Sequence, residues 1–267
     1  MKKQIAMAAL IALGAASVAY GAAAKGAGVV GSPHDLYSQA SYKGNEGQGR
    51  ICAYCHTPHH ATTAGADYLP LWAKDLSQDT GTFFVAYNTS TINNAESGDV
   101  TKDKAIGPTR LCMSCHDGTV APDQHYGSAG GTGTKLTDDT FGGAGVGAGA
   151  AGLTNDHPVG FDYPAVAVGP ATGDPTGADI AAAAGNPQDP FIRNPGAFYK
   201  NNNFQLTISD RLYAASDGKR YMTCATCHDV HNKKNVYSVA ENAGVVANYL
   251  VLAPQNNSDL CLSCHIK

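Results

Sequence analysis

The sequence predicts a mostly irregular chain with short helices and a few short strands, rather than a regular helical, sheet or mixed fold. Its 267 residues include 31 glycines and 13 prolines, the residues that most often interrupt helices and strands. Aromatic residues make up 8% of the chain and charged residues 15%. Because large aromatic side chains dominate the packing of protein cores, a conventional core is difficult to build from so few.

The chain begins with the pattern of a secretory signal peptide. Met1, Lys2 and Lys3 give a positive start, an apolar run over residues 5–18 is too short for a stable membrane anchor, and small residues follow. We predict a signal peptide over residues 1–24, cut after about residues 21–24. The exported mature chain, residues 25–267, is expected to form a single domain without a membrane span. The formal net charge of −4 argues against nucleic acid as a partner.

Regular structure in the rest of the chain is expected to be sparse. Short strands are expected at residues 83–87 and 204–208, and residues 240–252 form an apolar run that suits either a helix or an extended segment. Residues 127–152 are rich in Gly, Ala and Thr and predict a surface loop. A phosphate-binding loop is the alternative there, but no strand precedes it and no Gly-Lys-Ser/Thr follows. Residues 164–195 are rich in Pro, Gly and Ala and are expected to be irregular.

The strongest chemical signal is a cysteine pattern that occurs four times. All eight cysteines form pairs with the spacing C-x-x-C, and a histidine follows each pair directly. The pairs are Cys52/Cys55, Cys112/Cys115, Cys224/Cys227 and Cys261/Cys264, followed by His56, His116, His228 and His265.

Three familiar roles for cysteine explain only part of this pattern. A disulfide within C-x-x-C closes a very small loop and constrains the unfolded chain little. Zinc bound by four thiolates suits the spacing but gives no reason for a histidine after every pair. A redox dithiol needs one such pair in a thioredoxin-like context rather than four.

Covalent haem attachment explains every part of the pattern. The two thiols form thioethers with the porphyrin, and the adjacent histidine is placed to bind the iron from one side. We therefore predict four c-type haems, with each motif on a single helical turn. The haems, as large apolar discs, are expected to replace the missing core, which gives a haem-organised multihaem cytochrome c.

The second iron ligand decides between electron transfer and catalysis, because an iron with two protein ligands only passes electrons. Methionine serves at most one haem, since Met113 lies inside a C-x-x-C pair and only Met222 remains outside the signal peptide. The histidines outside the motifs are His34, His59, His60, His125, His157 and His231.

Two of these histidines, His59 and His231, lie three residues after a motif histidine. Such a histidine is too close to reach the far face of its own haem, but it can reach a neighbouring one. Our predicted set of second ligands is His34, His59, His157 and His231, one for each iron, with His60 and His125 as alternatives.

Several segments resemble a known family of multihaem proteins. The segments "SPHDL", "RICAYCHTPHH", "GPTRLCMSCHDGTVAP", "NDHPVGFDY" and "CATCHDVHN" look like those of the tetrahaem outer-surface c-type cytochromes, a doubled C-x-x-C-H family. The resemblance runs from about His34 to the C-terminus and is carried by the motifs. It implies bis-histidine haems, close haem stacking, and a homopolymeric extracellular filament in which one axial histidine comes from the adjacent subunit.

The expected function is electron transfer without substrate turnover, with other cytochromes as redox partners and extracellular acceptors such as metal oxides or partner cells. The expected location is the outer cell surface, with the periplasm as the alternative. A monomeric periplasmic shuttle and a nitrite or hydroxylamine reductase are the alternative functions. Because His34 follows a glycine-rich arm, our hypothesis is that it binds the last haem of the adjacent subunit. The alternative is that His34 caps the first or second haem of its own chain and that a different histidine bridges the subunits.

Overall fold

The computed structural model describes twelve segments of the chain. The expected signal peptide, the expected strand at 83–87, His125 and nearly all of the loop 127–152 lie outside them. The described residues are 28–43, 47–63, 66–76, 106–124, 133–136, 153, 156–186, 188–202, 204–231, 238–240, 246–248 and 250–267.

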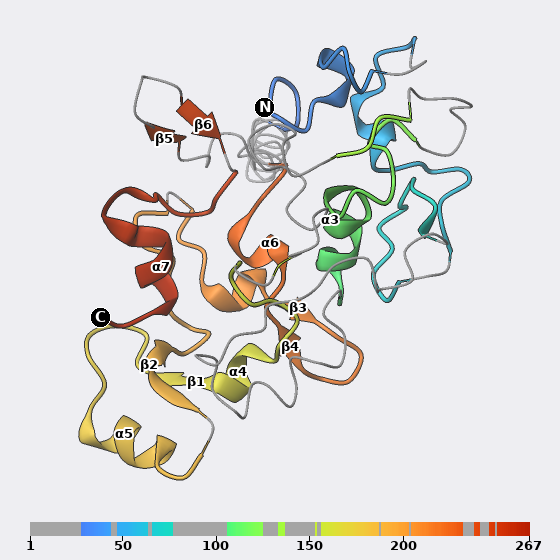
Figure 1. Cartoon of the computed structure of the whole chain (residues 1–267). Helices are drawn as coiled ribbons and strands as arrows, with labels where there is room; N and C mark the ends of the chain where they lie inside the picture. Colours follow the sequence, from blue (N-terminus) through green and yellow to red (C-terminus); the bar gives the residue numbers. More distant parts are fainter. Residues whose placement is uncertain are drawn as a thin grey trace, which may run out of the picture.

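Within these segments the helices and strands are short and are joined by irregular structure (Figure 1). The longest of them is helix α3, with nine residues. Among the described residues, no helix has the length and apolar character needed to cross a membrane. The elements are η1 (Leu36–Ser38), η2 (Ile51–Tyr54), α3 (Pro108–His116), α4 (Tyr163–Val166), β1 (Ala167–Gly169), α5 (Gly177–Ala183), β2 (Asp189–Arg193), η4 (Ile208–Arg211), β3 (Tyr213–Ala214), β4 (Arg220–Tyr221), α6 (Cys224–Cys227), β5 (Ser238–Ala240), β6 (Val246–Asn248), η6 (Asn256–Ser258) and α7 (Asp259–Cys264).

The strands form three separate two-stranded sheets in the described part of the chain. Strands β1 and β2 pair in parallel, whereas β3 pairs with β4, and β5 with β6, in antiparallel fashion. Of the two alternatives for residues 240–252, the extended one holds for β6. Two-stranded sheets are only marginally stable alone, so these must depend on packing against the rest of the chain.

The expectation of irregular structure over residues 164–195 is wrong. Elements α4, β1, α5 and β2 occupy most of this stretch. Thr176 and Asp179 form a reciprocal capping box at the start of α5, and alanines with high helix propensity follow. Gly169 lets β1 approach β2 closely, because a Cβ there would lie 2.5 Å from the carbonyl oxygen of Pro190.

The strand expected over residues 204–208 is also wrong. Thr207 makes only an isolated bridge with Phe198, and the 3-10 helix η4 begins at Ile208. Thr207 accepts a hydrogen bond from the backbone N–H of Asp210, whose carboxylate accepts one from the Thr207 N–H. This capping box stabilises a helical start where the apolar pattern alone suggests a strand.

All four C-x-x-C segments begin within a helix. Three lie on about one helical turn, as expected: η2, α6 and the C-terminal half of α7. The second lies at the end of the longer α3, which begins a turn earlier because Pro108 occupies its first position. In the view of Figure 1, α7, α6 and α3 follow one another across the molecule.

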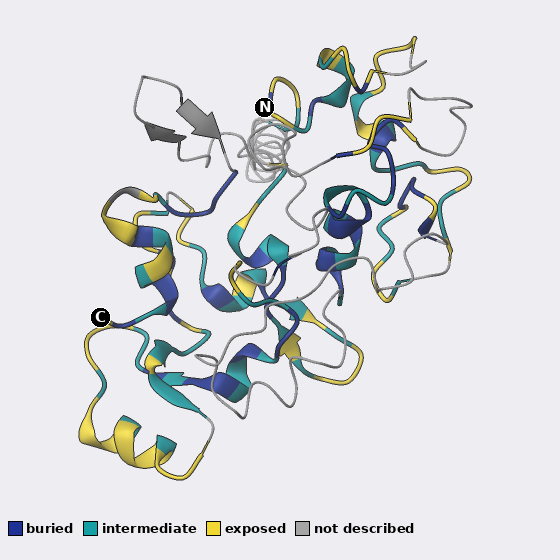
Figure 2. Cartoon of the chain, viewed as in Figure 1, coloured by how far each residue is buried: buried dark blue, intermediate teal, exposed yellow. Residues whose placement is uncertain are grey.

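Buried apolar side chains form three separate clusters in the described residues rather than one core. Figure 2 shows where along the chain the buried residues lie. Each cluster includes or contacts a motif residue. Cys264 belongs to the largest, which also contacts Cys227, while Met113 belongs to the second and Cys55 contacts the third. The largest contains Phe161, Tyr163, Val166, Ala167, Ala197, Tyr199, Ile208, Leu212, Met222, Leu252, Ala253 and Cys264.

Candidate haem-binding sites

Three of the four motif histidines lie beside a histidine from outside the motifs. The ring centroids in these pairs are 5.9 to 6.2 Å apart. Two imidazoles bound to one metal ion lie about 6 Å apart, since each metal–nitrogen bond is about 2 Å and each ring centre lies about 1 Å further. Each pair therefore leaves room for one iron. The pairs are His34 with His116, His56 with His231, and His157 with His265.

Two of these six rings have their Nδ1 atom held by a carbonyl oxygen. His56 Nδ1 donates to Pro70 at 2.6 Å, and His157 Nδ1 donates to Pro158 at 2.9 Å. A hydrogen bond at Nδ1 sets the tautomer and leaves Nε2 as the free lone pair. Both rings are therefore in the form that binds a metal through Nε2.

The backbone of the first motif histidine is held by a segment about fifteen residues further along the chain. His56 forms an antiparallel bridge with Trp72. On either side of it, the Thr57 N–H donates to Leu71 at 2.8 Å, and the Ala73 N–H donates to Cys55 at 2.8 Å. The indole of Trp72 also meets the His56 ring edge-on, with centroids 6.1 Å apart.

The third motif repeats this arrangement with a different segment. His228 bridges Val251, the Asp229 N–H donates to Leu250 at 2.8 Å, and the Leu252 N–H donates to Cys227 at 2.9 Å. Both holding segments enter the bridge through a leucine with a left-handed backbone. These leucines are Leu71, with a φ of 54°, and Leu250, with a φ of 55°.

At the fourth motif, His265 bridges Ile192 of β2, and the Ile266 N–H donates to Phe191 at 2.8 Å. The sequence did not predict the segments that bridge the motif histidines. They lie at different distances along the chain from their motifs, two after the motif and one before it. Short apolar runs containing Trp72 and Val251 are the only sequence signal for two of them.

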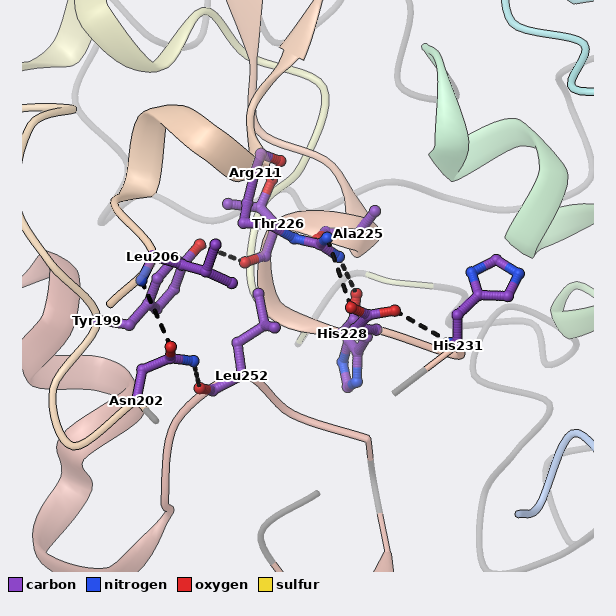
Figure 3. A network of polar contacts seen from close by, with 10 residues as sticks. Tyr199, Asn202, Leu206, Arg211, Ala225, Thr226, His228, His231 and Leu252 are labelled. Carbon is purple, nitrogen blue, oxygen red and sulfur yellow. Dashed lines mark hydrogen bonds and ion pairs between the residues drawn. The ribbon is translucent and has the colours of Figure 1, made fainter. Parts of the chain in front are cut away.

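The third motif is also held by a polar network around Arg211 (Figure 3). The guanidinium donates to the carbonyl oxygen of Ala225 from Nε at 3.2 Å and from Nη2 at 3.1 Å. Nη2 also donates to the carbonyl oxygen of His228 at 3.1 Å. Arg211 pairs with Asp229 at 3.6 Å, and the other Asp229 oxygen accepts the His231 N–H at 3.0 Å. One side chain thus links the motif histidine His228 with His231, which faces a different motif.

Further hydrogen bonds fix the same motif from its other side. The Tyr199 hydroxyl donates to the carbonyl oxygen of Thr226 (Figure 3). The Asn202 side chain donates to Leu252 and accepts from the Leu206 N–H. Because Leu252 itself bonds to the motif, the loop around Asn202 supports the third site indirectly.

Cysteines of successive motifs lie close to one another. The thiols of half-buried Cys112 and Cys224 share a hydrogen bond, which raises the pKa of Cys112 and lowers that of Cys224. In the other two neighbouring pairs, the charge of one thiol raises the pKa of the other: Cys115 acts on Cys55, and Cys264 acts on Cys227. The four attachment sites therefore follow one another in chain order. The neighbouring pairs are Cys55 with Cys115, Cys112 with Cys224, and Cys227 with Cys264.

Burial changes the chemistry of the thiols. It raises the pKa of Cys55 to about 11, that of Cys227 to about 12 and that of Cys264 to about 11. Such thiols do not form the thiolates that a redox dithiol needs near neutral pH. All eight cysteines are described, and all are free of disulfide bonds. Among the described residues, no three His, Cys, Asp or Glu side chains group as a metal-ion site.

His34 is half-buried, with its Nδ1 atom enclosed, and it lies beside a motif histidine of its own chain, as the alternative for this residue has it. Its ring centroid lies 6.0 Å from that of His116 in the same chain. Burial, followed by the charges of His116, His228 and His231, lowers the pKa of His34 to about 4. The imidazole is therefore neutral at pH 7, the form that binds iron. The last motif has His157 beside it instead.

His59 and His60, by contrast, are exposed and follow the first motif on an irregular segment. The described residues show neither ring against a motif histidine, although His59 was expected to bind iron. If the three observed pairs each hold one iron, then His59, His60 and His125 are the histidines left for the site of His228.

Comparisons with family models, with curated protein sequences and with solved structures find no match to this chain.

Proposed function

We propose that this protein binds four c-type haems covalently and passes electrons between them. The observation that carries the proposal is the set of three histidine pairs with ring centroids 5.9 to 6.2 Å apart. Each pair joins a histidine of a C-x-x-C-H motif to one from elsewhere in the chain, so two imidazoles lie beside each other at three of the four cysteine pairs that can fix a haem. When bound, each haem supplies an iron that alternates between the ferric and ferrous states.

The residues of the chain have distinct tasks in this proposal. The cysteine pairs form thioether bonds and fix each haem edge, while the helical turn that contains them sets the direction of the following histidine. Carbonyl oxygens hold Nδ1 of His56 and His157, so that Nε2 faces the metal position. Buried apolar side chains around Cys264 and Cys55 exclude water from the sites.

Ligation from both sides favours electron transfer over catalysis. A histidine on each face of an iron leaves no position for a substrate oxygen or nitrogen. A nitrite or hydroxylamine reductase needs at least one open face. The test is the addition of carbon monoxide to the reduced protein: an unchanged Soret band supports electron transfer, and a shifted band supports a reductase.

We also propose, on the family resemblance alone, that the protein is the repeating subunit of an extracellular filament with other cytochromes and extracellular acceptors as partners. The alternative is a monomeric periplasmic shuttle. If a histidine bridges subunits, exposed His59 and His60 are better placed than half-buried His34, which lies beside His116. Negative-stain microscopy of the secreted protein distinguishes filaments from monomers.

The central experiment is a haem count on the mature protein. Mass spectrometry is expected to show four covalent haems that survive acid–acetone extraction, since thioethers are not broken by acid. Magnetic circular dichroism is expected to show low-spin iron with two histidine ligands. Fewer than four haems in a fully matured preparation would overturn the assignment of at least one motif.

A further inference from the structure

Lys74 is a buried lysine with an unusual position. Its side chain is 1% exposed, and its Nζ donates hydrogen bonds to the carbonyl oxygens of Pro122 and Gln124. Burying a charged group is unfavourable unless its hydrogen bonds and its electrostatic surroundings compensate. A neutral amide would satisfy two carbonyl groups equally well, so the hydrogen bonds alone do not explain a charged side chain here.

The ammonium group of Lys74 lies where the first two haem-attachment sites meet. The preceding residue, Ala73, donates its N–H to Cys55 of the first motif at 2.8 Å. Pro122 and Gln124 belong to the segment that follows α3, the helix of the second motif. Lys74 therefore ties the segment that holds the first motif to the segment that follows the second.

The electrostatic influence of Lys74 reaches both sites. Burial raises the pKa of the Cys55 thiol, and the Lys74 ammonium opposes this rise. The same is true at Cys115, where burial raises the pKa and Lys74 again acts against it. A unit positive charge thus lies within electrostatic range of two cysteines, one from each of two successive motifs.

We propose that Lys74 raises the reduction potentials of the haems attached at the first two motifs. This inference rests on the proposed function, because it needs haems bound through Cys55 and Cys115. Reduction adds one electron to each iron, and no bond forms or breaks and no proton moves. The added negative charge is stabilised by a nearby ammonium in a region of low dielectric, so the ferrous form is favoured.

The effect is expected to be larger at the first haem, because Lys74 directly follows the residue that bonds Cys55, whereas a buried carboxylate, Asp117, directly follows the second motif histidine. At Cys115, the carboxylates of Asp117 and Asp123 act in the opposite direction to Lys74. These side chains are buried, 6% and 1% exposed. At Cys55, the largest influences on the thiol pKa are burial, the Lys74 charge and the charges of Cys115 and Cys52. Lys74 and the two aspartates together therefore separate the potentials of two neighbouring haems.

The test is a spectroelectrochemical titration of the haem-loaded protein with Lys74→Gln, using dithionite as reductant and ferricyanide as oxidant. Glutamine keeps amide donors for Pro122 and Gln124 but removes the charge. The expected result is that one of the four reduction potentials falls, so that the ferric–ferrous equilibrium constant of that haem changes about tenfold toward the ferric form. That is the effect of a unit charge roughly 10 Å away at an effective dielectric constant of about 20. A second potential falls by less, and two are unchanged.

Lys135→Gln is the matched control, since Lys135 is exposed and contacts no motif residue within the described part of the chain, so its replacement is expected to leave all four potentials unchanged. Asp123→Asn is the second variant. It removes a negative charge and is therefore expected to raise one reduction potential, whereas Lys74→Gln lowers one. Unchanged potentials in Lys74→Gln with four haems retained would overturn the inference. If Lys74→Gln fails to accumulate, an unchanged Asp123→Asn titration overturns it. A wild-type count below four haems would count against the proposed function instead.

Discussion

Replacing Arg211 by alanine is expected to disturb two haem sites from a single position. The guanidinium makes three hydrogen bonds to two carbonyl oxygens, those of Ala225 and His228, at 3.1 to 3.2 Å. It also pairs with Asp229 at 3.6 Å, with both side chains about one-fifth exposed. Because Asp229 holds the His231 N–H, the change reaches the ring that faces His56.

The size of the effect follows from these contacts. A hydrogen bond to a charged donor contributes about 1.5–3 kcal/mol net, whereas a partly exposed ion pair adds at most about 1 kcal/mol. The bonds to Ala225 share one acceptor and are not additive. We therefore expect Arg211→Ala to lower the free energy of unfolding by about 3 kcal/mol. For a chain of this length, that corresponds to a fall in Tm of roughly 6–12 °C.

The assay combines thermal melting, followed in the Soret region, with the high-spin absorption band near room temperature. Arg211→Ala is expected to lower Tm and to give one haem a partial high-spin signal, because His231 loses its fixed orientation. Arg211→Lys is expected to restore part of the Tm, since lysine keeps the charge but cannot span two carbonyl groups. Arg220→Ala is the matched control, because the exposed Arg220 guanidinium donates to Ser209 rather than to a motif carbonyl oxygen. Equal melting of the wild type and Arg211→Ala, without a high-spin signal, would refute the argument.

Three further changes test the rest of the structure. His231→Ala is expected to make one haem fully high-spin by electron paramagnetic resonance, because it removes one ligand and leaves the other three sites intact. Gly107→Ala is expected to lower the free energy of unfolding by about 1–3 kcal/mol in chemical denaturation, since Gly107 has a φ of 56° and a Cβ would lie 2.6 Å from the Tyr213 ring. Hydrogen bonds from Thr207 lower the pKa of Asp210, so this cap contributes most above the unfolded pKa of about 4. Asp210→Asn is therefore expected to cost about 1 kcal/mol at pH 7, and the difference from the wild type is expected to shrink as the pH falls through the lowered folded pKa.

The controls for these changes use similar residues in open positions. Gly133 has a φ of 70°, and a Cβ added there would have no other atom within 4 Å, so Gly133→Ala isolates backbone strain from the clash with Tyr213. Equal losses at Gly107 and Gly133 would contradict the steric argument. For the cap, an Asp210→Asn difference that stays constant from pH 7 to pH 3 would contradict the titration of this carboxylate.

The sequence predicts the local parts of the sites better than their assembly. The helical turns at three motifs follow from cysteine and histidine spacing alone. The short distance between His228 and His231 predicts that His231 serves a different motif, and its ring lies beside that of His56. The sequence did not predict where His34 packs, because a glycine-rich arm has no local conformational preference that fixes its position. Its burial beside His116 depends on contacts across 82 residues of chain, which no local pattern encodes.

The segments that hold the motif histidines show the same limit. Leu71 and Leu250 adopt left-handed backbones that leucine rarely takes, so propensity argues against the observed conformation at both. Such strain persists where the surroundings determine the backbone, here through bridges to His56 and His228. The left-handed backbones of Leu71 and Leu250 therefore result from the bridges to the motif histidines rather than from the local conformational preference of leucine.

The apolar interior of the described residues is divided into three clusters, which explains why the backbone depends on the motif sites. The three clusters of the described residues are separate, and each contains or contacts a residue of a C-x-x-C-H motif. Small separate clusters bury too little apolar surface to offset the conformational entropy of a long irregular chain. Four haems placed between the clusters would join them into one continuous apolar interior. On this view the haems hold the fold together as well as carrying electrons, and Cys112→Ala with Cys115→Ala would remove one haem and expose the chain around α3 to protease, while the folded segments at the other sites persist.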